Sequence, residues 1–343
     1  ECNLSVVPYL DSGIKNQDSN WNDEFWRNTN LVSNDLFSGI ISKTNKTNFE
    51  VCTYMSNKLF YENKTISPLS VTKNKFKNKL SQIYNIKVQK GKTLKLIKLG
   101  GYVCNKINSQ TNILESTEKI IKRVINFDFE ELLKSQAKSW KKIWEISDIE
   151  IVGDPKSQQA IRFNIFHLNQ TYTGKDPTLN IGPKGFTGEK YGGSTYWDTE
   201  AYCLPFYMFT KDQFVSRNLL KYRYLQLNKA IENAEKLGFC KGAALFPMVT
   251  MNGEECHNEW EITFEEIHRN GAIAFAIYNY TRYTSDKSYI REMGLEILIA
   301  ISRFWSQRFS FSNDKEKYVM LGVTGPNEYE NNVNNNWYTN YIA

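Results

Sequence analysis

The spacing of apolar residues changes along this 343-residue chain, and the change constrains its fold more than any other feature. Before about residue 128, segments such as Phe49–Met55 alternate apolar and polar side chains, which is typical of half-buried strands. From about residue 153 the apolar residues recur with a period near 3.6, which is typical of amphipathic helices. Strands followed by helices predict separate β and helical domains and disfavour a doubly wound sheet.

Three regions follow from this pattern. Residues 1–128 are predicted to form several short strands with turns, as part of a β-sandwich. Residues 129–152 are predicted to form a charged helical linker, because their apolar side chains recur at helical spacing. Residues 153–343 are predicted to be helical, with candidate helices over 157–172, 197–209, 213–237, 261–284 and 288–309.

Composition excludes several classes of function. The net charge of +6 is mild, and the nine lysines between residues 73 and 98 accompany no nucleic-acid motif, so a solvated sheet face is the favoured interpretation. No run of 18 apolar residues occurs, so no membrane span is expected. The six cysteines form no C-x-x-C pair, which favours thiols in a cytoplasmic protein. No glycine-rich phosphate-binding motif supports a nucleotide cofactor.

The connections between the helices are expected to carry the site. Those over 173–196, 241–260 and 320–337 are long and combine Gly, Trp, Glu and Asn. Long connections in a compact domain are usually functional or disordered, and aromatic content argues against disorder. At the end of the first, where the candidate helix begins, Trp197 offers a flat face to a sugar ring and Asp198 accepts hydrogen bonds from hydroxyls. The alternative is that Asp198 caps a helix and Trp197 packs in the core.

The second and third connections each leave alternatives open. His257 and Glu259 lie in a run of four carboxylates, one His and one Trp, which suits a substrate-contacting loop, a solvated acidic loop or, less well, a metal site. In the third, Gly325-Pro326 forces a turn that would place Glu328 on a fixed loop, as a general acid with an apolar surround requires. The alternative there is an Asn-rich turn before another helix.

Four segments give the chain a family resemblance. Tyr191–Glu200 and Val323–Tyr329 resemble the signature of glycoside hydrolase family 65, and Cys256–Glu261 with Asn331–Trp337 resemble its maltose-specific members. The resemblance implies a β-sandwich, a helical linker and the first part of an (α/α)6 barrel. It implies inverting phosphorolysis of maltose to β-glucose 1-phosphate and glucose, in a homodimer that needs no metal or organic cofactor. Family enzymes continue through a second half of the barrel, where the resemblance places the phosphate site.

Residue roles are implied by the same resemblance. Glu328 matches the general acid, Trp197 and Asp198 match the pocket for the transferred glucosyl ring, and His257 and Glu259 match the loop that contacts the leaving glucose. Phosphorolysis of trehalose or kojibiose is the nearest alternative. An inverting α-glucosidase would need a second carboxylate as base. A carbohydrate-binding fragment without activity would use Trp197 and Asp198 only.

Overall fold

The computed structural model describes residues 1–13, 24–45, 48–74, 78–105, 112–183, 185, 190–257 and 260–343. The described part divides into two compact units, Glu1–Lys142 and Ile143–Ala343, and the boundary falls within helix α2 (Phe129–Ser147). Helix α2 occupies most of the segment predicted as a helical linker. No described helix is long and apolar enough to span a membrane.

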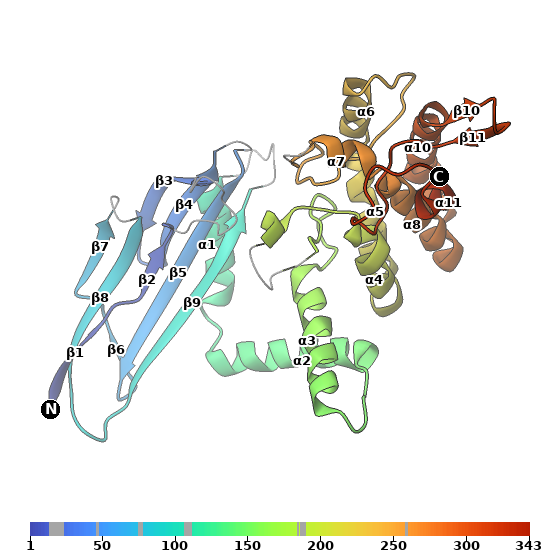
Figure 1. The fold of residues 1–343 in the computed structure, drawn as a ribbon. Helices are drawn as coiled ribbons and strands as arrows, with labels where there is room; N and C mark the ends of the chain where they lie inside the picture. The colour runs from blue at the N-terminus through green and yellow to red at the C-terminus, as the bar shows by residue number, and fades with distance from the viewer. Residues whose placement is uncertain are drawn as a thin grey trace. The chain divides into compact units, whose positions relative to one another are not determined.

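The amino-terminal unit contains two antiparallel sheets (Figure 1). In one, β5 pairs along one edge with β9 and along the other with β4 and β6, and β3 pairs with β4. In the other, β8 pairs with β7 on one edge and with β1 and β2 on the other. The strands are β1 (Cys2–Val6), β2 (Tyr9–Asp11), β3 (Trp26–Ser33), β4 (Ser38–Thr44), β5 (Glu50–Tyr61), β6 (Lys64–Ile66), β7 (Ser70–Asn74), β8 (Lys79–Val88) and β9 (Leu94–Cys104).

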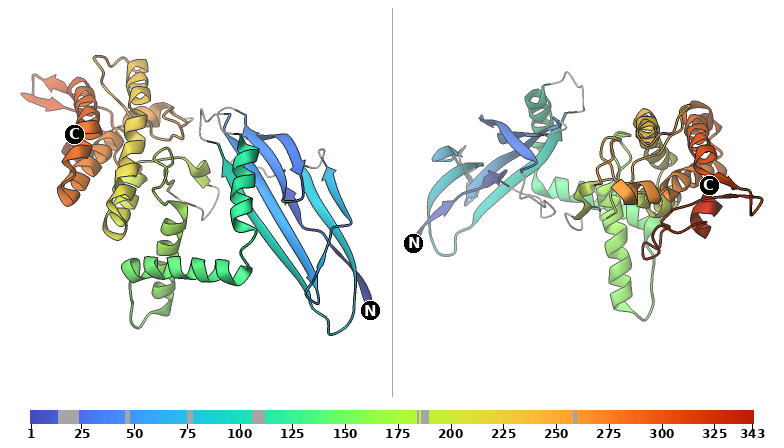
Figure 2. Two further views of the ribbon diagram at one scale, coloured as in Figure 1. Left: turned by 180° about the vertical axis from the view of Figure 1, so that it is seen from behind. Right: turned by 45° about the horizontal axis from the view of Figure 1, so that its top comes forward.

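Alternation along β4 and β5 gives the larger sheet two buried faces. Ile40 and Met55 pack with Leu80 from the other sheet, which forms the core between the two sheets. Ile41 and Cys52 point the other way and pack against helix α1 (Ile113–Val124), which covers that face (Figure 2). The predicted sandwich is therefore confirmed. The prediction missed α1, whose buried Ile113, Thr117 and Ile121 follow helical spacing within the region assigned to strands.

Lysines on these sheets have partners. Lys79 lies 3.1 Å from Asp11 and Lys92 3.2 Å from Glu62, while Lys98 donates to the Tyr9 carbonyl at 3.0 Å. These contacts agree with the interpretation as a solvated sheet face. The side chains of residues 73, 75 and 77 lie outside the described part of the chain.

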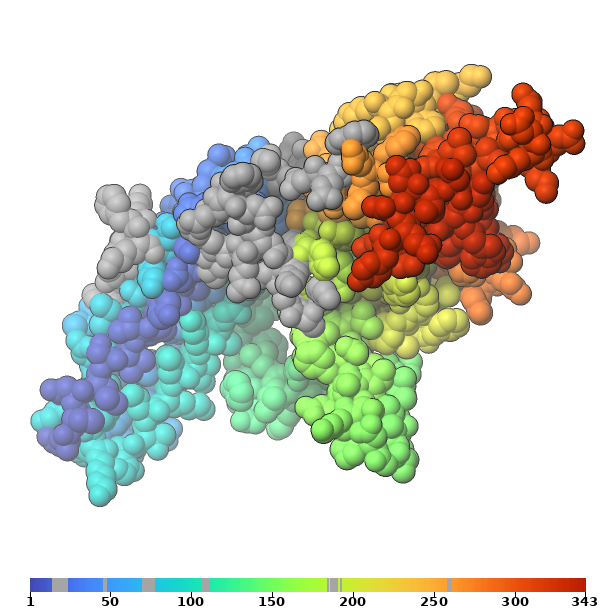
Figure 3. Space-filling view, in the orientation of Figure 1, coloured from blue at the N-terminus to red at the C-terminus, as the bar shows by residue number. Residues whose placement is uncertain are grey.

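The carboxyl-terminal unit is helical, as predicted. Its elements after α2 are α3 (Pro155–Thr171), α4 (Leu204–Thr210), α5 (Gln213–Leu225), α6 (Leu227–Lys236), α7 (Trp260–Glu265), α8 (His268–Thr284), α9 (Lys287–Tyr289), α10 (Leu295–Arg308) and α11 (Trp337–Ile342). Strands β10 (Ser310–Ser312) and β11 (Lys317–Val319) form a hairpin that projects from this unit (Figure 3).

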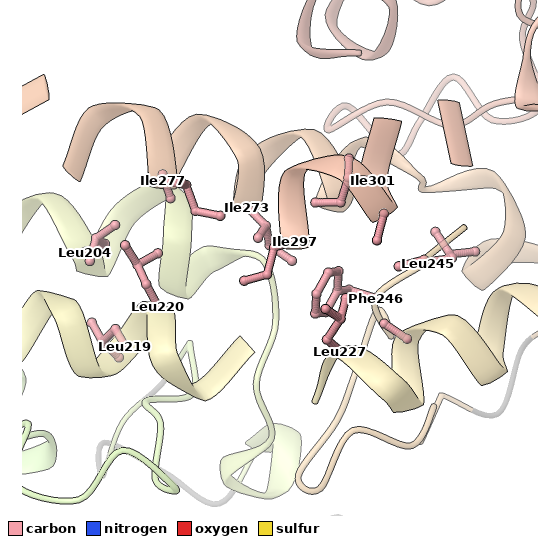
Figure 4. Packing of buried hydrophobic residues seen from close by; sticks show 14 of the residues in the cluster. Leu204, Leu219, Leu220, Leu227, Leu245, Phe246, Ile273, Ile277, Ile297 and Ile301 are labelled. Carbon is pink, nitrogen blue, oxygen red and sulfur yellow. The ribbon is translucent and has the colours of Figure 1, made fainter. Parts of the chain in front are cut away.

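Helix α8 lies in the middle of the unit's core. Ile273 and Ile277 of α8 pack with Leu220 of α5 and with Ile297 and Ile301 of α10 (Figure 4). Burying an aliphatic side chain of this size contributes about 1.5–3 kcal/mol, so this cluster holds the helices that carry the connections. The arrangement agrees with the first part of an (α/α)6 barrel.

Four predicted helices are interrupted in the structure. The helix expected over 288–309 contains a π-helical turn, Ile290–Gly294, between α9 and α10. The helix expected over 213–237 breaks at Gln226, where α5 ends and α6 begins. The helix expected over 261–284 breaks after Glu265, before α8. The segment after Trp197 begins as a π-helical turn, Thr199–Cys203, before Pro205 in the first turn of α4, where a missing N–H is tolerated. Continuous apolar spacing does not reveal such breaks.

Candidate active site

The first and second connections are joined through their backbones. Thr195 and Thr250 exchange two hydrogen bonds, with N···O distances of 2.7 and 3.1 Å. The Tyr222 hydroxyl of α5 accepts from Thr195 Oγ1 at 3.1 Å and donates to the Met251 carbonyl at 3.1 Å. These contacts place the two connections side by side, with α5 as their common support.

A buried ion pair fixes the turn that carries Trp197 and Asp198. The Glu200 carboxylate accepts hydrogen bonds from Arg223 Nε at 2.7 Å and from Arg223 Nη2 at 2.9 Å. Both side chains are at most 2% exposed. Arg223 also donates to the Tyr196 carbonyl at 3.3 Å. Because Arg223 belongs to α5, the helical core determines the position of this turn.

Trp197 stands among aromatic rings from two other segments. Its ring centroid lies 4.9 Å from that of His268 in an edge-to-face arrangement and 6.3 Å from that of Tyr338. Trp197 and Asp198 are both half-buried, and the Asp198 side chain does not cap the turn that follows. The capping alternative for Asp198 therefore fails, and Trp197 keeps part of its surface accessible.

His268, at the start of α8, links Trp197 to the third connection. Its Nδ1 lies 3.3 Å from the Thr324 carbonyl oxygen, which can only accept. Burial, and then the nearby Arg269 cation, lower the pKa of His268 to about 4. The imidazole is therefore neutral at physiological pH and acts here as a hydrogen-bond donor and an aromatic neighbour.

The second connection is organised around Glu255. Its carboxylate accepts backbone hydrogen bonds from Met248 at 2.7 Å, Val249 at 3.1 Å and His257 at 3.2 Å. The structure thus anchors the backbone at His257, whose side chain is half-buried. Glu259, the other predicted acceptor-side residue, lies outside the described residues.

The third connection is anchored at its base and exposed at its tip. Val323 and Val333 exchange two backbone hydrogen bonds of 2.9 Å. At the base, Thr324 Oγ1 donates to Glu265 Oε2 at 2.6 Å, and Thr324 N–H donates to the Glu265 carbonyl at 3.2 Å. Glu328 lies at the exposed tip. The described residues therefore hold the loop in place but do not give Glu328 the apolar surround that the sequence argument expected.

Replacing Thr324 by Val should loosen this loop. The substitution leaves Glu265 Oε2 without its donor and removes the acceptor of the Asn332 N–H, which lies 3.1 Å from Thr324 Oγ1. We expect a loss of about 1–3 kcal/mol in the free energy of unfolding, measured by urea denaturation. Thr324→Ser keeps the hydroxyl and is the matched control. Equal stability of the Val and Ser variants would contradict the anchoring role.

Glu266 is a second carboxyl group near Glu328. It is 3% exposed, and its Oε1 has no hydrogen-bond partner among the described residues. Burial raises the pKa of Glu266 to about 7, with a further increase from the Glu328 charge and a smaller one from Glu265, opposed by Arg269. Glu266 and His268 are not among the site residues predicted from the sequence. The signal available was the pattern Glu265-Glu266-Ile267-His268, where polar residues interrupt an apolar helix face.

A separate cavity in the amino-terminal unit does not fit the predicted chemistry. It has a volume of about 310 Å³ and is lined by polar residues that include Asn28 and Asn78. Asn28 Nδ2 already donates to Ser12 Oγ at 2.8 Å and to Asn78 Oδ1 at 2.9 Å. The amide groups that line this cavity are already engaged in hydrogen bonds within the protein. The three connections of the carboxyl-terminal unit therefore remain the candidate site.

Both units match domains of one family. The family described as "Glycosyl hydrolase family 65, N-terminal domain" matches residues 1–143, and "Glycosyl hydrolase family 65 central catalytic domain" matches residues 162–343. The chain therefore belongs to glycosyl hydrolase family 65.

Several individual proteins of the family are similar to this chain over most of its length. The chain is 47% identical to maltose phosphorylase of Bacillus subtilis (strain 168) over 99% of its own length and 44% of that protein. It is 34% identical to alpha,alpha-trehalose phosphorylase of Thermoanaerobacter brockii over 89% of its length and 38% of that protein. A solved protein from the human microbiome, whose description suggests a kojibiose phosphorylase, superposes with a TM-score of 0.87 at 29% identity, over 99% of this chain and 44% of that one. The chain thus spans less than half of each.

Proposed function

We propose that this protein catalyses the inverting phosphorolysis of maltose to β-glucose 1-phosphate and glucose. The supporting observation is the 47% identity to a maltose phosphorylase over 99% of the chain, against 34% over 89% for a trehalose phosphorylase. The geometry fits this proposal, because the Thr195–Thr250 pairing and the contacts of His268 and Thr324 join all three predicted connections in one unit.

In the proposed reaction Glu328 is the general acid. A phosphate oxygen attacks the anomeric carbon as the glycosidic bond breaks, and Glu328 gives its proton to the departing glucose oxygen. Attack from the face opposite the leaving group inverts the anomeric configuration. Phosphate fills the place that an inverting hydrolase reserves for water and a second carboxylate, so one carboxyl group suffices. Trp197 would stack on the transferred glucosyl ring and Asp198 would accept its hydroxyls.

His257 and Glu259 are proposed to contact the leaving glucose. The anchoring of the His257 backbone by Glu255 supports a defined loop at this position. This loop would then distinguish maltose from trehalose and kojibiose, whose bonds present the second glucose differently. The proposed reaction needs no metal or organic cofactor, because phosphate, a co-substrate, is the nucleophile and Glu328 supplies the proton.

The deciding assay measures glucose release from maltose, trehalose and kojibiose, each with and without phosphate. It should use both this chain and the longest natural polypeptide that contains it. Release from maltose only in the presence of phosphate is the expected result. Release without phosphate would favour an inverting α-glucosidase, release from another disaccharide would change the acceptor, and no release from either polypeptide would favour a carbohydrate-binding role.

Replacing His257 by Ala should impair acceptor recognition. If its side chain makes one hydrogen bond to the leaving glucose, kcat/KM for maltose should fall about tenfold. In the reverse reaction the KM for glucose should rise, while the KM for β-glucose 1-phosphate should stay near that of the unmodified protein. An equal rise in both KM values would show that His257 does not act on the acceptor side.

We also propose an oligomeric state, from the family resemblance, and a cytoplasmic location, from the cysteines. We infer a homodimer, which light scattering of the longest natural polypeptide would test against a monomer. The six cysteines occur as thiols, which fits the reducing cytoplasm.

A further inference from the structure

We propose that His268 is a positioning residue that holds two parts of the candidate site in place relative to each other: the Trp197 ring and the connection that carries Glu328. The inference rests on the proposed function for its catalytic consequence, while the two contacts themselves belong to the folded chain. It assigns a role to a buried histidine that the acid-only mechanism leaves unused.

The first support is the place of the His268 side chain in the fold. His268 is the first residue of α8, and its side chain is 1% exposed. A buried polar group costs free energy unless it is hydrogen-bonded, so the partners of this imidazole are part of the folded structure. Because core packing around Ile273 and Ile277 fixes α8, the ring gives both neighbouring segments a rigid reference point.

The second support is the contact between His268 and Trp197. Their ring centroids lie 4.9 Å apart and their planes meet at 88°, an edge-to-face arrangement. Tyr338 of α11 lies 5.9 Å from His268 and 6.3 Å from Trp197 between ring centroids, which makes a group of three rings. Trp197 is only half-buried, so these neighbours orient the indole and still leave part of its surface to a sugar.

The third support is the hydrogen bond between His268 and Thr324. The Nδ1 of His268 lies 3.3 Å from the Thr324 carbonyl oxygen. Because a carbonyl oxygen only accepts, Nδ1 carries the proton and is the donor. Thr324 is 1% exposed, and its hydroxyl donates to Glu265 Oε2 at 2.6 Å. The bond from His268 therefore belongs to a buried base from which the third connection emerges.

The path from this base to Glu328 is short and closely packed. Glu328 lies four positions after Thr324. Gly325 is buried, and a Cβ added there would lie 2.6 Å from Nδ2 of Asn336, the residue that caps α11. A displacement of Thr324 would therefore move Glu328 as well. The hydrogen bond from α8 thus helps to set the distance between the proposed proton donor and the aromatic surface for the glucosyl ring.

Two substitutions separate the two contacts of His268. His268→Phe keeps a ring beside Trp197 but has no group to donate to the Thr324 carbonyl. His268→Asn removes the ring but keeps an N–H donor near the position of Nδ1. Both variants would be made in the longest natural polypeptide. Phosphate-dependent turnover would be measured with maltose and with α-glucosyl fluoride, whose leaving group needs far less protonation than a sugar oxygen.

The two variants should fail in different ways. His268→Phe should lower kcat for maltose about tenfold, because Glu328 is correctly placed less often, and should largely retain turnover of the fluoride. His268→Asn should raise KM for both substrates about fivefold, because Trp197 is correctly oriented in fewer molecules, with kcat for maltose nearly unchanged. A similar loss in both variants on both substrates would indicate a general structural defect and overturn the proposal.

His167 provides matched controls. It lies in α3, its ring centroid is 4.2 Å from that of Phe163 in an edge-to-face contact, and its Nδ1 lies 2.9 Å from Gln170 Nε2. His167→Phe and His167→Asn therefore make the same chemical changes at a histidine that also has an aromatic neighbour and a hydrogen bond. Both should keep the kcat and KM of the unmodified protein. The same division of kcat and KM effects at His167 would overturn the assignment to His268.

Amide hydrogen exchange tests the anchoring of the loop without any activity. Residues 323–333 should exchange faster in His268→Phe than in His268→Asn or the unmodified protein, because the base of the loop has lost a hydrogen bond. Equal exchange in all three would overturn the positioning of Glu328. If one variant failed to fold, the other would still test its own contact through kcat or KM. If the unmodified protein showed no phosphorolysis, the proposed function would fail, while exchange would still decide whether His268 holds the loop.

Discussion

Glu328→Gln is expected to lower kcat for maltose phosphorolysis about 10²–10⁴-fold, the usual contribution of a positioned general acid. Gln keeps the size and hydrogen-bonding ability of the side chain but has no proton to give to the departing glucose oxygen. Binding of maltose, followed by tryptophan fluorescence or calorimetry, should survive, because Trp197 and Asp198 are unchanged. The variant thus separates an enzyme from a carbohydrate-binding protein.

A substrate with a better leaving group sharpens this test. α-Glucosyl fluoride releases fluoride, which needs far less protonation than a sugar oxygen, so phosphate-dependent turnover of the fluoride should be largely retained by Glu328→Gln. Glu330→Gln, which removes a carboxylate from the same exposed loop, should behave like the unmodified protein on both substrates. Full activity of Glu328→Gln on maltose would show that another group is the acid.

Arg223→Met is expected to produce the largest loss of stability among single substitutions near the site. It leaves the buried Glu200 carboxylate without the guanidinium that now donates two hydrogen bonds to it. Breaking one partner of a buried pair costs about 3–5 kcal/mol, because the remaining charge is uncompensated. The free energy of unfolding from urea denaturation measures the effect.

Two comparison variants make the stability result interpretable. Arg291→Met removes an exposed arginine whose side chain is 80% accessible, and it should leave the denaturation midpoint nearly unchanged. The double variant Arg223→Met/Glu200→Met should recover part of the loss, because no buried charge remains unpaired. If Arg223→Met were as stable as Arg291→Met, the pair would not be what holds the turn before α4.

Local sequence was informative where one face of an element is buried. The alternation in β4 and β5 predicted strands correctly because Ile40 and Ile41 must reach opposite faces of one sheet. Helix α1 was missed because its short apolar stripe follows closely after β9, the last strand of the amino-terminal unit. The breaks at Gln226 and after Glu265 were missed because apolar spacing continues across both.

Part of the candidate site could be proposed from the sequence, again because local residue patterns are informative. Trp197, Asp198 and Glu328 stand in motifs whose residue types are unusual side by side, and family resemblance identified them. Glu266 was not predicted, since a Glu in a helical pattern normally points to solvent. Its burial and the effect of Glu328 on its pKa depend on the packing of α7, α8 and the third connection.

The sequence by itself determined the change from a β domain to a helical domain, the three connections that carry the candidate site, and the family, because spacing and local motifs are properties of neighbouring residues. Only the tertiary structure decided that Arg223 anchors the turn after Trp197, that Thr324 anchors the loop of Glu328, and that Glu266 is buried. The two hydrogen-bonded anchors join residues 23 and 59 positions apart, so they exist only once the chain has folded.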